Sequence, residues 1–316
     1  MTTAYGSIGG ARPEPASATR IRRVAAALLA LAMQPALAAS LVTIDPHASY
    51  PEGPLWQDGR LLYVEYAGSN IKVWDGKAAT VYWHKAGCGA DGLIAFSGLL
   101  LVACYDDNTL VELDRSGREV RVIKADSGGK PFAGPNDLAS DGQGGIYFTA
   151  SGVYDVKAPI TGSVYHVNAD GIAITEVAST IHYSNGLTLT NDKTQLLVAE
   201  MLAGRILSFP VRPDGSLGPR TVWARLQDLA PPTAHEDPYN GPDGLKLGPD
   251  GNYYIAQNGS GRILVVNENR KLVRIIKVPT RFVTNIGFGK DGVVFVTGSF
   301  EQWKAPYPGA VYRWKP

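Results

Sequence analysis

The chain has 316 residues, of which 45% are hydrophobic and 19% charged, and its formal net charge is +1. This size and composition permit a globular core, in one large domain or two small ones. A charge near zero gives no reason to expect a nucleic acid or an anionic membrane as partner. The 36 glycines and 21 prolines suit many tight turns between short strands.

Residues 1–38 have the features of a secretory signal peptide. The apolar run Val24–Met33 follows three arginines and precedes the small residues Ala36–Ala38, which suit cleavage. The run has about half the length that spans a bilayer, so a membrane anchor is the less favoured alternative. We therefore expect cleavage after Ala38 and a periplasmic or secreted protein, residues 39–316, with no membrane association. Without the four Arg and one Glu of the leader, 26 basic and 28 acidic side chains remain, a net charge of −2.

A short phrase, an acid or amide residue followed by Gly-Leu or a similar pair, recurs along the rest of the chain. Its copies are Glu52-Gly53-Pro54-Leu55, Asp91-Gly92-Leu93, Asn136-Asp137-Leu138, Asn185-Gly186-Leu187, Asp243-Gly244-Leu245 and, more weakly, Asn285-Ile286-Gly287. The first residues of successive copies are separated by 39, 45, 49, 58 and 42 residues, against about 40–50 for common propeller blades. The spacing therefore indicates a repeat architecture.

Each copy of the phrase is followed by a turn and a β-rich run, which is a strong hairpin signal. These runs are Leu61–Tyr66, Leu99–Tyr105, Ile146–Ala150, Gln195–Glu200, Asn252–Gln257 and Val293–Gly298. A third β-rich run follows in every unit and a fourth in most units, as in Glu119–Lys124. Four antiparallel strands repeated six times predict an all-β fold, a six-bladed β-propeller. A pair of β-sandwiches is the rival fold, but it would not explain six copies of one phrase.

The last unit lacks a fourth strand because the chain ends at Pro316. The segment Leu41–Ile44 precedes the first unit and has no other partner. We predict that this N-terminal strand completes the last blade, which closes the ring and protects its edges. The longer intervals between phrases must hold loops, for which Asp126–Ala133, Ser151–Gly162 and Asp228–Gly241 are candidates.

The two cysteines, Cys88 and Cys104, leave two possibilities. An exported protein could join them in a disulfide. However, a hairpin that turns at Ser97-Gly98 would place Cys104 opposite Asp91 rather than Cys88. We therefore expect two free, half-buried thiols, with the disulfide as the alternative. No cysteine and histidine spacing typical of a zinc site is present.

The phrases predict a ring of oxygen donors. In a propeller the innermost strands begin at one mouth of the central channel, where six side chains should meet: Glu52, Asp91, Asn136, Asn185, Asp243 and Asn285. Facing carboxylates repel one another unless a cation neutralises them. Carboxylate and amide oxygens favour a hard cation, and a site of this size suits Ca²⁺ better than Mg²⁺. The alternative is that these residues only form turns, but Glu is a poor turn former and Glu52 favours the metal site.

Several of these phrases together resemble the motifs of the SMP-30/gluconolactonase/luciferin-regenerating-enzyme family. The resemblance is carried by Glu52-Gly53-Pro54-Leu55-Trp56, Pro135-Asn136-Asp137-Leu138, Ser184-Asn185-Gly186-Leu187 and Pro242-Asp243-Gly244-Leu245-Lys246, and covers about residues 45–315. It implies a six-bladed propeller that binds one divalent metal ion and often hydrolyses a small-molecule lactone. By this resemblance Glu52, Asn185 and Asp243 are metal ligands, and Asn136 lies nearby as a ligand or substrate contact.

The reaction that the resemblance implies is metal-assisted hydrolysis of a cyclic ester. Ca²⁺ is the expected ion, with Zn²⁺, Mg²⁺ or Mn²⁺ as alternatives, and it would polarise the lactone carbonyl as a Lewis acid. Asp243 would be the general base or would orient a metal-bound water. Two departures matter: Gly134 stands where the sugar-lactonase branch has an arginine, and Ala150 stands where many bacterial relatives have an aspartate.

Further candidates for the site are weaker. Asp91 and His235 are candidates for substrate binding or an additional ligand, since His235 lies in the longest loop and could hang over the mouth. His182 lies three residues before Asn185 and could face the same mouth. A group of aromatic residues, Tyr50, Trp303 and Tyr307, could line an apolar substrate wall or pack between blades.

Three functions remain open at this point. A metal-dependent lactone or ester hydrolase is favoured, because it needs the full set of oxygen donors. A non-catalytic propeller that binds a ligand or a protein is the first alternative, since one fold hosts many activities. A strictosidine-synthase-like enzyme, which would need no cation at the mouth, is the second.

Overall fold

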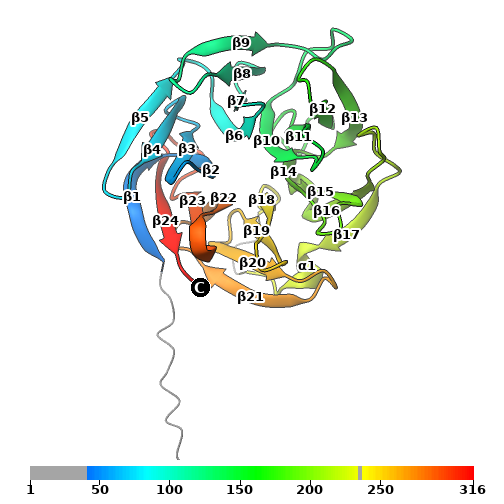
Figure 1. Cartoon of the computed structure of the whole chain (residues 1–316). Coiled ribbons are helices and arrows are strands. Elements are labelled where there is room, and N and C mark those ends of the chain that lie inside the picture. The colour runs from blue at the N-terminus through cyan, green and yellow to red at the C-terminus, as the bar shows by residue number, and fades with distance from the viewer. Residues whose placement is uncertain (1–40, 234–236) are drawn as a thin grey trace, which may run out of the picture. The chain divides into compact units, whose positions relative to one another are not determined.

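The computed structural model describes residues 41–233 and 237–316, so the expected signal peptide and His235 lie outside the described residues. The described residues form six four-stranded antiparallel sheets, arranged around a common axis as the blades of a propeller (Figure 1). The six-bladed propeller predicted from the repeat is therefore confirmed. Outside the sheets this part of the chain holds only short helical turns: α1 (Leu226–Leu229), η1 (Met201–Ala203) and η2 (Lys290–Gly292). None of the helices in this part is long and apolar enough to cross a membrane.

The strands of each blade follow one another outward from the axis (Figure 1). The innermost strands are β2 (Pro51–Gln57), β6 (Ala90–Phe96), β10 (Pro135–Ser140), β14 (Ser184–Leu189), β18 (Pro242–Leu247) and β22 (Phe282–Phe288). The second strands are β3 (Arg60–Glu65), β7 (Leu99–Cys104), β11 (Ile146–Ala150), β15 (Gln195–Glu200), β19 (Tyr253–Gln257) and β23 (Val294–Ser299). The third strands are β4 (Asn70–Trp74), β8 (Thr109–Leu113), β12 (Gly162–Val167), β16 (Arg205–Pro210), β20 (Arg262–Val266) and β24 (Pro308–Trp314). The outermost strands are β5 (Ala79–His84), β9 (Glu119–Ile123), β13 (Ile174–Ile181), β17 (Thr221–Arg225), β21 (Leu272–Lys277) and β1 (Val42–Ser49).

The turns between the first two strands of a blade are set by their sequence. Asp58-Gly59 joins β2 to β3 with φ angles of 50° and 77°, and Ser97-Gly98 joins β6 to β7 with φ angles of 48° and 78°. Two consecutive residues with positive φ are typical of the turn whose twist matches that of a hairpin. These local signals fix the connection between the innermost and the second strand in the first two blades.

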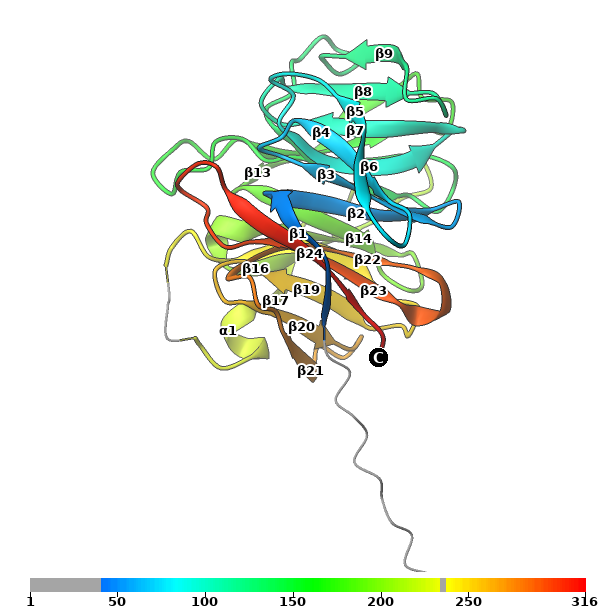
Figure 2. The ribbon, with the colours of Figure 1, turned by 90° about the vertical axis from the view of Figure 1, so that its left-hand side faces the viewer.

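The N-terminal strand closes the ring as predicted. β1 pairs antiparallel with β24 at the outer side of the sixth blade (Figure 2). A polar cluster then ties this strand to the first blade. Asp45 of β1 accepts a hydrogen bond from the hydroxyl of Tyr63, and the Lys72 Nζ lies 3.1 Å from Asp45 Oδ2 and 2.8 Å from Glu65 Oε1. The first and last blades are therefore joined by charge as well as by packing.

The core lies between neighbouring blades. One cluster packs Val64 and Ile71 of the first blade against Val102 and Val111 of the second, and all four are fully buried. Clusters of the same kind lie between each of the other neighbouring pairs in the described chain. Each blade thus buries both of its faces, which fixes the positions of the innermost strands around the axis.

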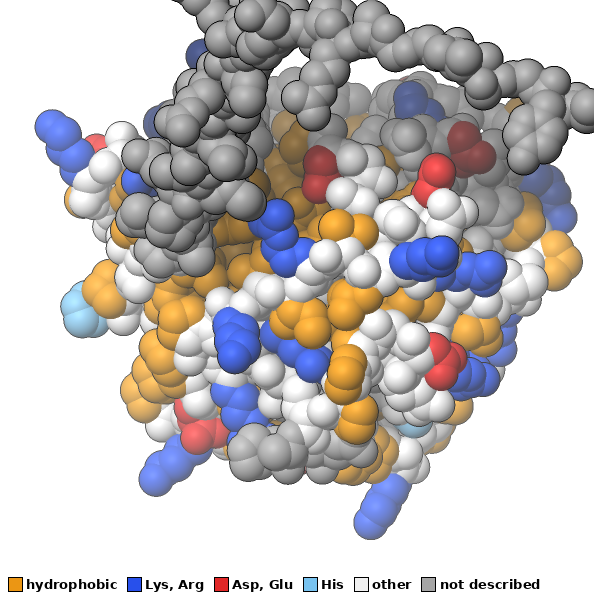
Figure 3. Space-filling view, turned by 90° about the horizontal axis from the view of Figure 1, so that it is seen from below, with side chains coloured by type: hydrophobic (Ala, Val, Ile, Leu, Met, Phe, Trp, Pro, Cys, Tyr) orange, Lys and Arg blue, Asp and Glu red, His pale blue; other side chains and the backbone are white. Residues whose placement is uncertain are grey.

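The outermost strands leave one edge of each sheet free. Figure 3 views the propeller from the side of β21, where Lys and Arg side chains stand singly among hydrophobic ones. In β21 itself Arg274 and Lys277 are interspersed with the exposed Val273 and Ile275. Charged side chains on an edge strand discourage pairing with another chain.

The expectation of free thiols is wrong, because Cys88 and Cys104 form a disulfide with a Cα–Cα distance of 4.6 Å. The register explains the error. A shift within β6 places Cys104 opposite Ala90, and pairing continues beyond the strand through a hydrogen bond from Tyr105 N–H to the carbonyl of Gly89. The carbonyl of Cys88 accepts hydrogen bonds from the backbone N–H groups of Asp106 and Asp107, so Cys88 lies beside the segment that follows β7 and its side chain reaches Cys104. Both cysteines are fully buried.

Candidate functional site

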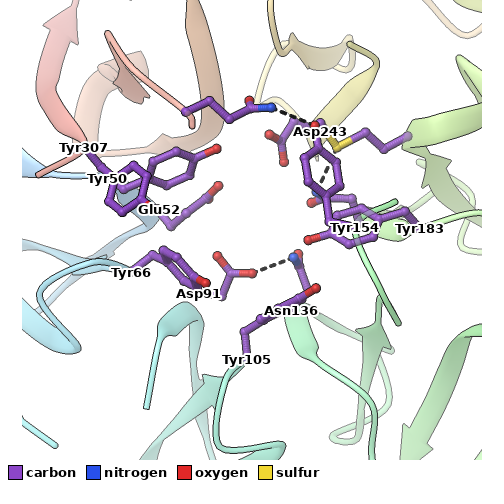
Figure 4. Close-up of a pocket in the computed structure, with 13 residues that line it drawn as sticks. Tyr50, Glu52, Tyr66, Asp91, Tyr105, Asn136, Tyr154, Tyr183, Asp243 and Tyr307 are labelled. Carbon is purple, nitrogen blue, oxygen red and sulfur yellow. Dashed lines mark hydrogen bonds between the residues drawn. The ribbon is translucent and has the colours of Figure 1, made fainter. Parts of the chain in front are cut away.

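The innermost strands begin around a cavity of about 170 Å³ at one mouth of the propeller (Figure 4). Its lining combines carboxylates, amides and aromatic rings: Tyr50, Glu52, Tyr66, Asp91, Tyr105, Asn136, Tyr154, Tyr183, Asn185, Met201, Asp243, Gln302 and Tyr307. The donors expected from the first five phrases are all among these residues. The convergence that the sequence indicated is therefore present, although the donors come from five separate blades.

A local irregularity aims the donors at the axis. In all six innermost strands the regular pairing is interrupted near the phrase, for example between Pro135 and Leu138, between Ser184 and Leu187, and between Pro242 and Leu245. The interrupted segments contain Asn136, Asn185 and Asp243. A bulge redirects a side chain that would otherwise alternate across the sheet. The polar side chains can therefore point along the mouth rather than into the packing between blades.

Close packing between innermost strands requires the glycine that follows a donor. A Cβ atom on Gly186 would lie 2.2 Å from the backbone nitrogen of Leu245, and one on Gly92 would lie 2.2 Å from the carbonyl oxygen of Asn136. Neighbouring innermost strands thus approach one another too closely for a side chain at these positions. The phrase begins a strand at the axis, so the interpretation of these residues as simple turn formers is not supported.

Three carboxylates face the cavity from buried positions. Glu52, Asp91 and Asp243 are 6%, 8% and 3% exposed. Burial, and then the negative charge of Asp243, raises the pKa of Glu52 well above its usual range, and the same two causes raise the pKa of Asp91. Burial raises the pKa of Asp243 to about 8, although a hydrogen bond from Asn258 opposes this shift. Three acids held this way would ionise more readily beside a cation.

The oxygen atoms of the site suit a hard divalent cation. Asp243 Oδ2 accepts a 2.8 Å hydrogen bond from Asn258, whereas the buried Asp243 Oδ1 has no hydrogen-bond partner among the described residues. The amide nitrogen of Asn185 contacts the Met201 sulfur at 3.6 Å, which leaves the amide oxygen for another partner. Within the described ranges no three His, Cys, Asp or Glu side chains form a metal-binding group by themselves. A cation here would need amide oxygens beside the carboxylates, as Ca²⁺ sites accept.

Asp91 and Asn136 are joined in the structure. The amide nitrogen of Asn136 donates a 2.6 Å hydrogen bond to Asp91 Oδ2 (Figure 4). The next residue, Asp137, is held in a different way, because the ammonium group of Lys246 lies 2.7 Å and 2.8 Å from its two oxygens. Lys246 comes from β18 and Asp137 from β10, so this ion pair joins two innermost strands. It neutralises Asp137 and leaves the three other carboxylates to face the cavity.

The sixth donor was assigned to the wrong residue. Asn285 does not line the cavity; its side-chain oxygen accepts a 2.9 Å hydrogen bond from the backbone N–H of Ile286. The paired positions show why: Ile286 lies opposite Val296 just as Leu245 lies opposite Ile255. Thr284 lies two residues before Ile286, as Asp243 lies two residues before Leu245. Thr284 is therefore the structural equivalent of Asp243. The weak sixth copy of the phrase was therefore aligned one residue too late.

The other weak candidates contribute little to the cavity. His182 does not line it, and its Nε2 is buried with no hydrogen-bond partner in the described part of the chain. Trp303 is 55% exposed and packs against Tyr154 and Tyr239 outside the cavity. His235 cannot be placed, because it lies outside the described residues.

An aromatic wall was only partly anticipated. The cavity is lined by six tyrosines, of which the sequence analysis named Tyr50 and Tyr307. Tyr183 precedes Asn185 by two residues, as Tyr50 precedes Glu52, and this shared position could have identified it. Tyr66 and Tyr105 each follow directly after a second strand, which is a weaker signal. Among the described lining residues there is no Lys, Arg or His.

Comparison with known protein families adds the decisive observation. Residues 50–300 match the family described as the SMP-30/Gluconolactonase/LRE-like region. The chain belongs to this family. Within it, the chain is similar to the lactonase drp35 of Staphylococcus saprophyticus, with 31% identity over 233 residues, which are 71% of this chain and 68% of that protein. Lactonase drp35 of Staphylococcus aureus (strain MRSA252) is 32% identical over 146 residues, so the match spans 42% of that relative's length.

Several solved structures share the fold. A gluconolactonase of Xanthomonas campestris superimposes with a TM-score of 0.72 at 22% identity, covering 88% of this chain and 90% of that chain. A luciferin-regenerating enzyme gives a TM-score of 0.70 at 19% identity, covering 88% and 96%. A calcium-binding protein, regucalcin of Agrobacterium tumefaciens, gives 0.69 at 18% identity, covering 87% and 93%. These likenesses support the propeller architecture of the family for the described chain.

Proposed function

We propose that this protein hydrolyses a lactone, with a divalent cation, Ca²⁺ by preference, bound at the mouth of the propeller. One observation carries the proposal: Glu52, Asn185 and Asp243 converge on one cavity, where the buried Asp243 Oδ1 has no partner in the described chain. Membership of a family that contains lactonases supports the reaction class. Glu52, Asn185 and Asp243 would hold the cation, and when bound it would draw electron density from the ester carbonyl.

Asp243 is the proposed base of the reaction. It would accept a proton from the water that attacks the lactone carbonyl. In the metal-free protein its pKa of about 8 keeps the carboxyl group largely protonated at neutral pH, so it is a poor base there. A positive charge close to a carboxylate lowers its pKa. Asp243 is therefore expected to serve as a base only when the cation is bound.

The lining of the cavity favours an uncharged substrate with a flat or apolar body. No cationic side chain is available among the described lining residues to pair with a carboxylate or phosphate on the substrate. At Gly134, where the resemblance would place an arginine, a Cβ atom would lie 2.6 Å from the ring of Tyr105. The ring of Tyr105 thus occupies the space that the Cβ atom of such an arginine would need. An aromatic surface replaces a positive charge at this point of the wall.

The purified protein can be tested with a panel of sugar, aromatic and aliphatic lactones, each with calcium, with zinc and with a chelator. We expect turnover that requires an added cation, with uncharged lactones preferred over lactones that carry a carboxylate or phosphate. Turnover that survives chelation would remove the cation from the proposal. Binding without turnover of any lactone would favour the non-catalytic propeller instead.

We also propose that the protein is exported and loses residues 1–38. The disulfide between Cys88 and Cys104 supports this, because such bonds persist mainly in oxidising compartments. Mass spectrometry of the protein from fractionated cells should find an N-terminus at Ala39 in the periplasm or the medium. An intact N-terminus in the cytoplasmic fraction alone would contradict export.

A further inference from the structure

Four blades approach the cavity through the same unusual backbone conformation. The residue two positions before the donor has a positive φ in each of them: 48° at Tyr50, 56° at Gly89, 63° at Gly134 and 63° at Tyr183. This left-handed region suits glycine and is strained for a residue with a bulky side chain. Glycine is present in two blades, but the other two hold tyrosine. A strained residue that the fold retains beside a cavity is a candidate for function.

Tyr183 belongs to a group of three packed tyrosines. Its ring lies 6.3 Å from that of Tyr105 and 4.7 Å from that of Tyr154, measured between centroids. The hydroxyls of these two neighbouring rings have partners within the protein. Tyr105 donates to the carbonyl of Gly152 at 2.8 Å, and Tyr154 donates to the carbonyl of Tyr239 at 2.7 Å. These three tyrosines form one fixed section of the wall.

Tyr50 differs from this section. Its ring is held edge-on by Tyr66 at 5.8 Å and by Tyr307 at 6.2 Å, and its backbone N–H donates to the carbonyl of Tyr307. Its hydroxyl, however, makes no hydrogen bond to any described residue. Tyr50 lines the same cavity as the carboxylates Glu52, Asp91 and Asp243. Figure 4 shows Tyr50 beside Glu52 on the cavity wall. The ring is therefore fixed, whereas the hydroxyl is left for a ligand.

We propose that Tyr50 is a substrate-contacting residue whose hydroxyl donates a hydrogen bond to the carbonyl oxygen of the lactone. The inference rests on the lactone hydrolysis proposed above and adds a donor supplied by the protein itself. When the oxygen of water bonds to the carbonyl carbon, negative charge develops on the carbonyl oxygen, and this hydrogen bond becomes stronger. The ring C–O bond then breaks, and the proton lost by the water passes to the departing alkoxide. Tyr50 keeps its own proton throughout.

The test compares Tyr50→Phe with Tyr147→Phe in the full, metal-loaded protein, using the lactone that the wild-type protein hydrolyses fastest. Tyr50→Phe keeps the ring and removes only the hydroxyl, so kcat should fall by about 100-fold, as when one oxyanion donor is lost. Tyr147 is fully buried outside the cavity and donates to the carbonyl of Gly215, so Tyr147→Phe should leave kcat unchanged. Calcium affinity, measured by titration calorimetry, should be the same in Tyr50→Phe and the wild type.

Two results would overturn the role of Tyr50 while lactone hydrolysis stands. One is a kcat for Tyr50→Phe close to that of the wild type. The other is a loss of calcium affinity in Tyr50→Phe that accounts for its lower rate, which would make Tyr50 a support of the metal ligands. Tyr50→Gly provides a second variant: it also removes the ring contacts with Tyr66 and Tyr307, so it should lower Tm as well as lower kcat at least as far as Tyr50→Phe. A wild-type protein that hydrolyses no lactone would overturn the proposed function and this inference together.

Discussion

β18 and β22 are neighbouring innermost strands with the same pairing pattern, but the residues at one equivalent position near their starts serve different purposes. In β18 the position holds Asp243, which faces the cavity with one unpaired oxygen in the described structure. In β22 it holds Thr284, whose hydroxyl donates a 2.7 Å hydrogen bond to the carbonyl of Pro51 in β2. β22 lies beside the seam at which the ring closes. The repeat therefore sets where a side chain stands, and the hydrogen bonds around it decide whether it is free to act.

The same contrast explains why the two residues that follow are not alike. Gly244 approaches β22 so closely that a Cβ atom would lie 2.3 Å from the Asn285 side-chain oxygen. Asn285, in the equivalent position of β22, has room for a side chain, which it uses to bind its own strand. The start of β18 thus leaves its polar side chain available to a ligand, whereas the start of β22 uses its side chains for hydrogen bonds near the ring closure.

The largest expected effect comes from replacing Asp243, the proposed general base, rather than its structural equivalent Thr284. Asp243→Asn should lower kcat for lactone hydrolysis by about 10³-fold, because it removes the proposed general base. Thr284→Val, at the equivalent position of β22, is the matched control and should keep kcat near the wild-type value. Circular dichroism should show an intact fold in both variants. Near wild-type activity in Asp243→Asn would exclude Asp243 from the mechanism.

A second effect concerns β6, because a disulfide joins Cys88, which precedes this strand, to Cys104 at the end of β7. Cys88 and Cys104 are separated by 16 residues. Replacing both with serine should lower the free energy of unfolding by about 3 kcal/mol, the value for a loop of this length. Urea titration measures the change, and reduction of the wild-type protein should reproduce it. A change well below this value would mean that the local hydrogen bonds already hold Asp91 in place.

Substitutions of the proposed metal ligands should affect calcium affinity, whereas substitutions at the seam should affect stability. Glu52→Gln removes one negative charge from the proposed site and should weaken calcium binding by about tenfold or more. Asn285→Ala should leave calcium binding unchanged but lower the free energy of unfolding by about 1–2 kcal/mol, because the buried N–H of Ile286 loses its acceptor. Calorimetry and denaturant titration distinguish the two. Equal losses of affinity would show that the ring of donors is not selective.

The smallest expected effect is the dependence of stability on pH in the metal-free protein. Folding raises the pKa values of Glu52, Asp91 and Asp243, the last to about 8, so the folded state binds more protons than the unfolded state between about pH 4 and pH 8. Stability contributed by these groups should therefore fall as pH rises through that range. Tm measured with a chelator should show the fall, and added calcium should reduce it. A slope that calcium does not change would argue against binding at these carboxylates.

The fold could be predicted because it depends on features that repeat. Six phrases, each followed by a turn and a strand, leave few alternatives to a propeller, and the unpaired segment Leu41–Ile44 indicated how the ring closes. The positions of Glu52, Asn185 and Asp243 followed from that architecture. Tyr66 and Tyr105 could not be assigned in the same way, because a tyrosine after a strand is equally compatible with packing between blades.

The two errors have a common physical origin. Both the pairing of Cys88 with Cys104 and the alignment of Thr284 depend on the register within an innermost strand, and that register shifts at each phrase. A shift of one residue changes which side chain points to the axis. The sequence contains the turns that start each hairpin but no readable signal for the bulge that follows.

The pairing of Val42 with Arg313 joins residues near opposite ends of the polypeptide. During synthesis the sixth sheet cannot be completed until β24 has left the ribosome, because β24 pairs with both β1 and β23. Among the strand pairs of the described chain, β1 and β24 are the farthest apart in the sequence, so their pairing carries the largest loop-closure entropy. The ring would therefore stay open until β24 has been made. That delay would suit the export proposed above, because a ring that closed early could not cross a membrane in an unfolded form.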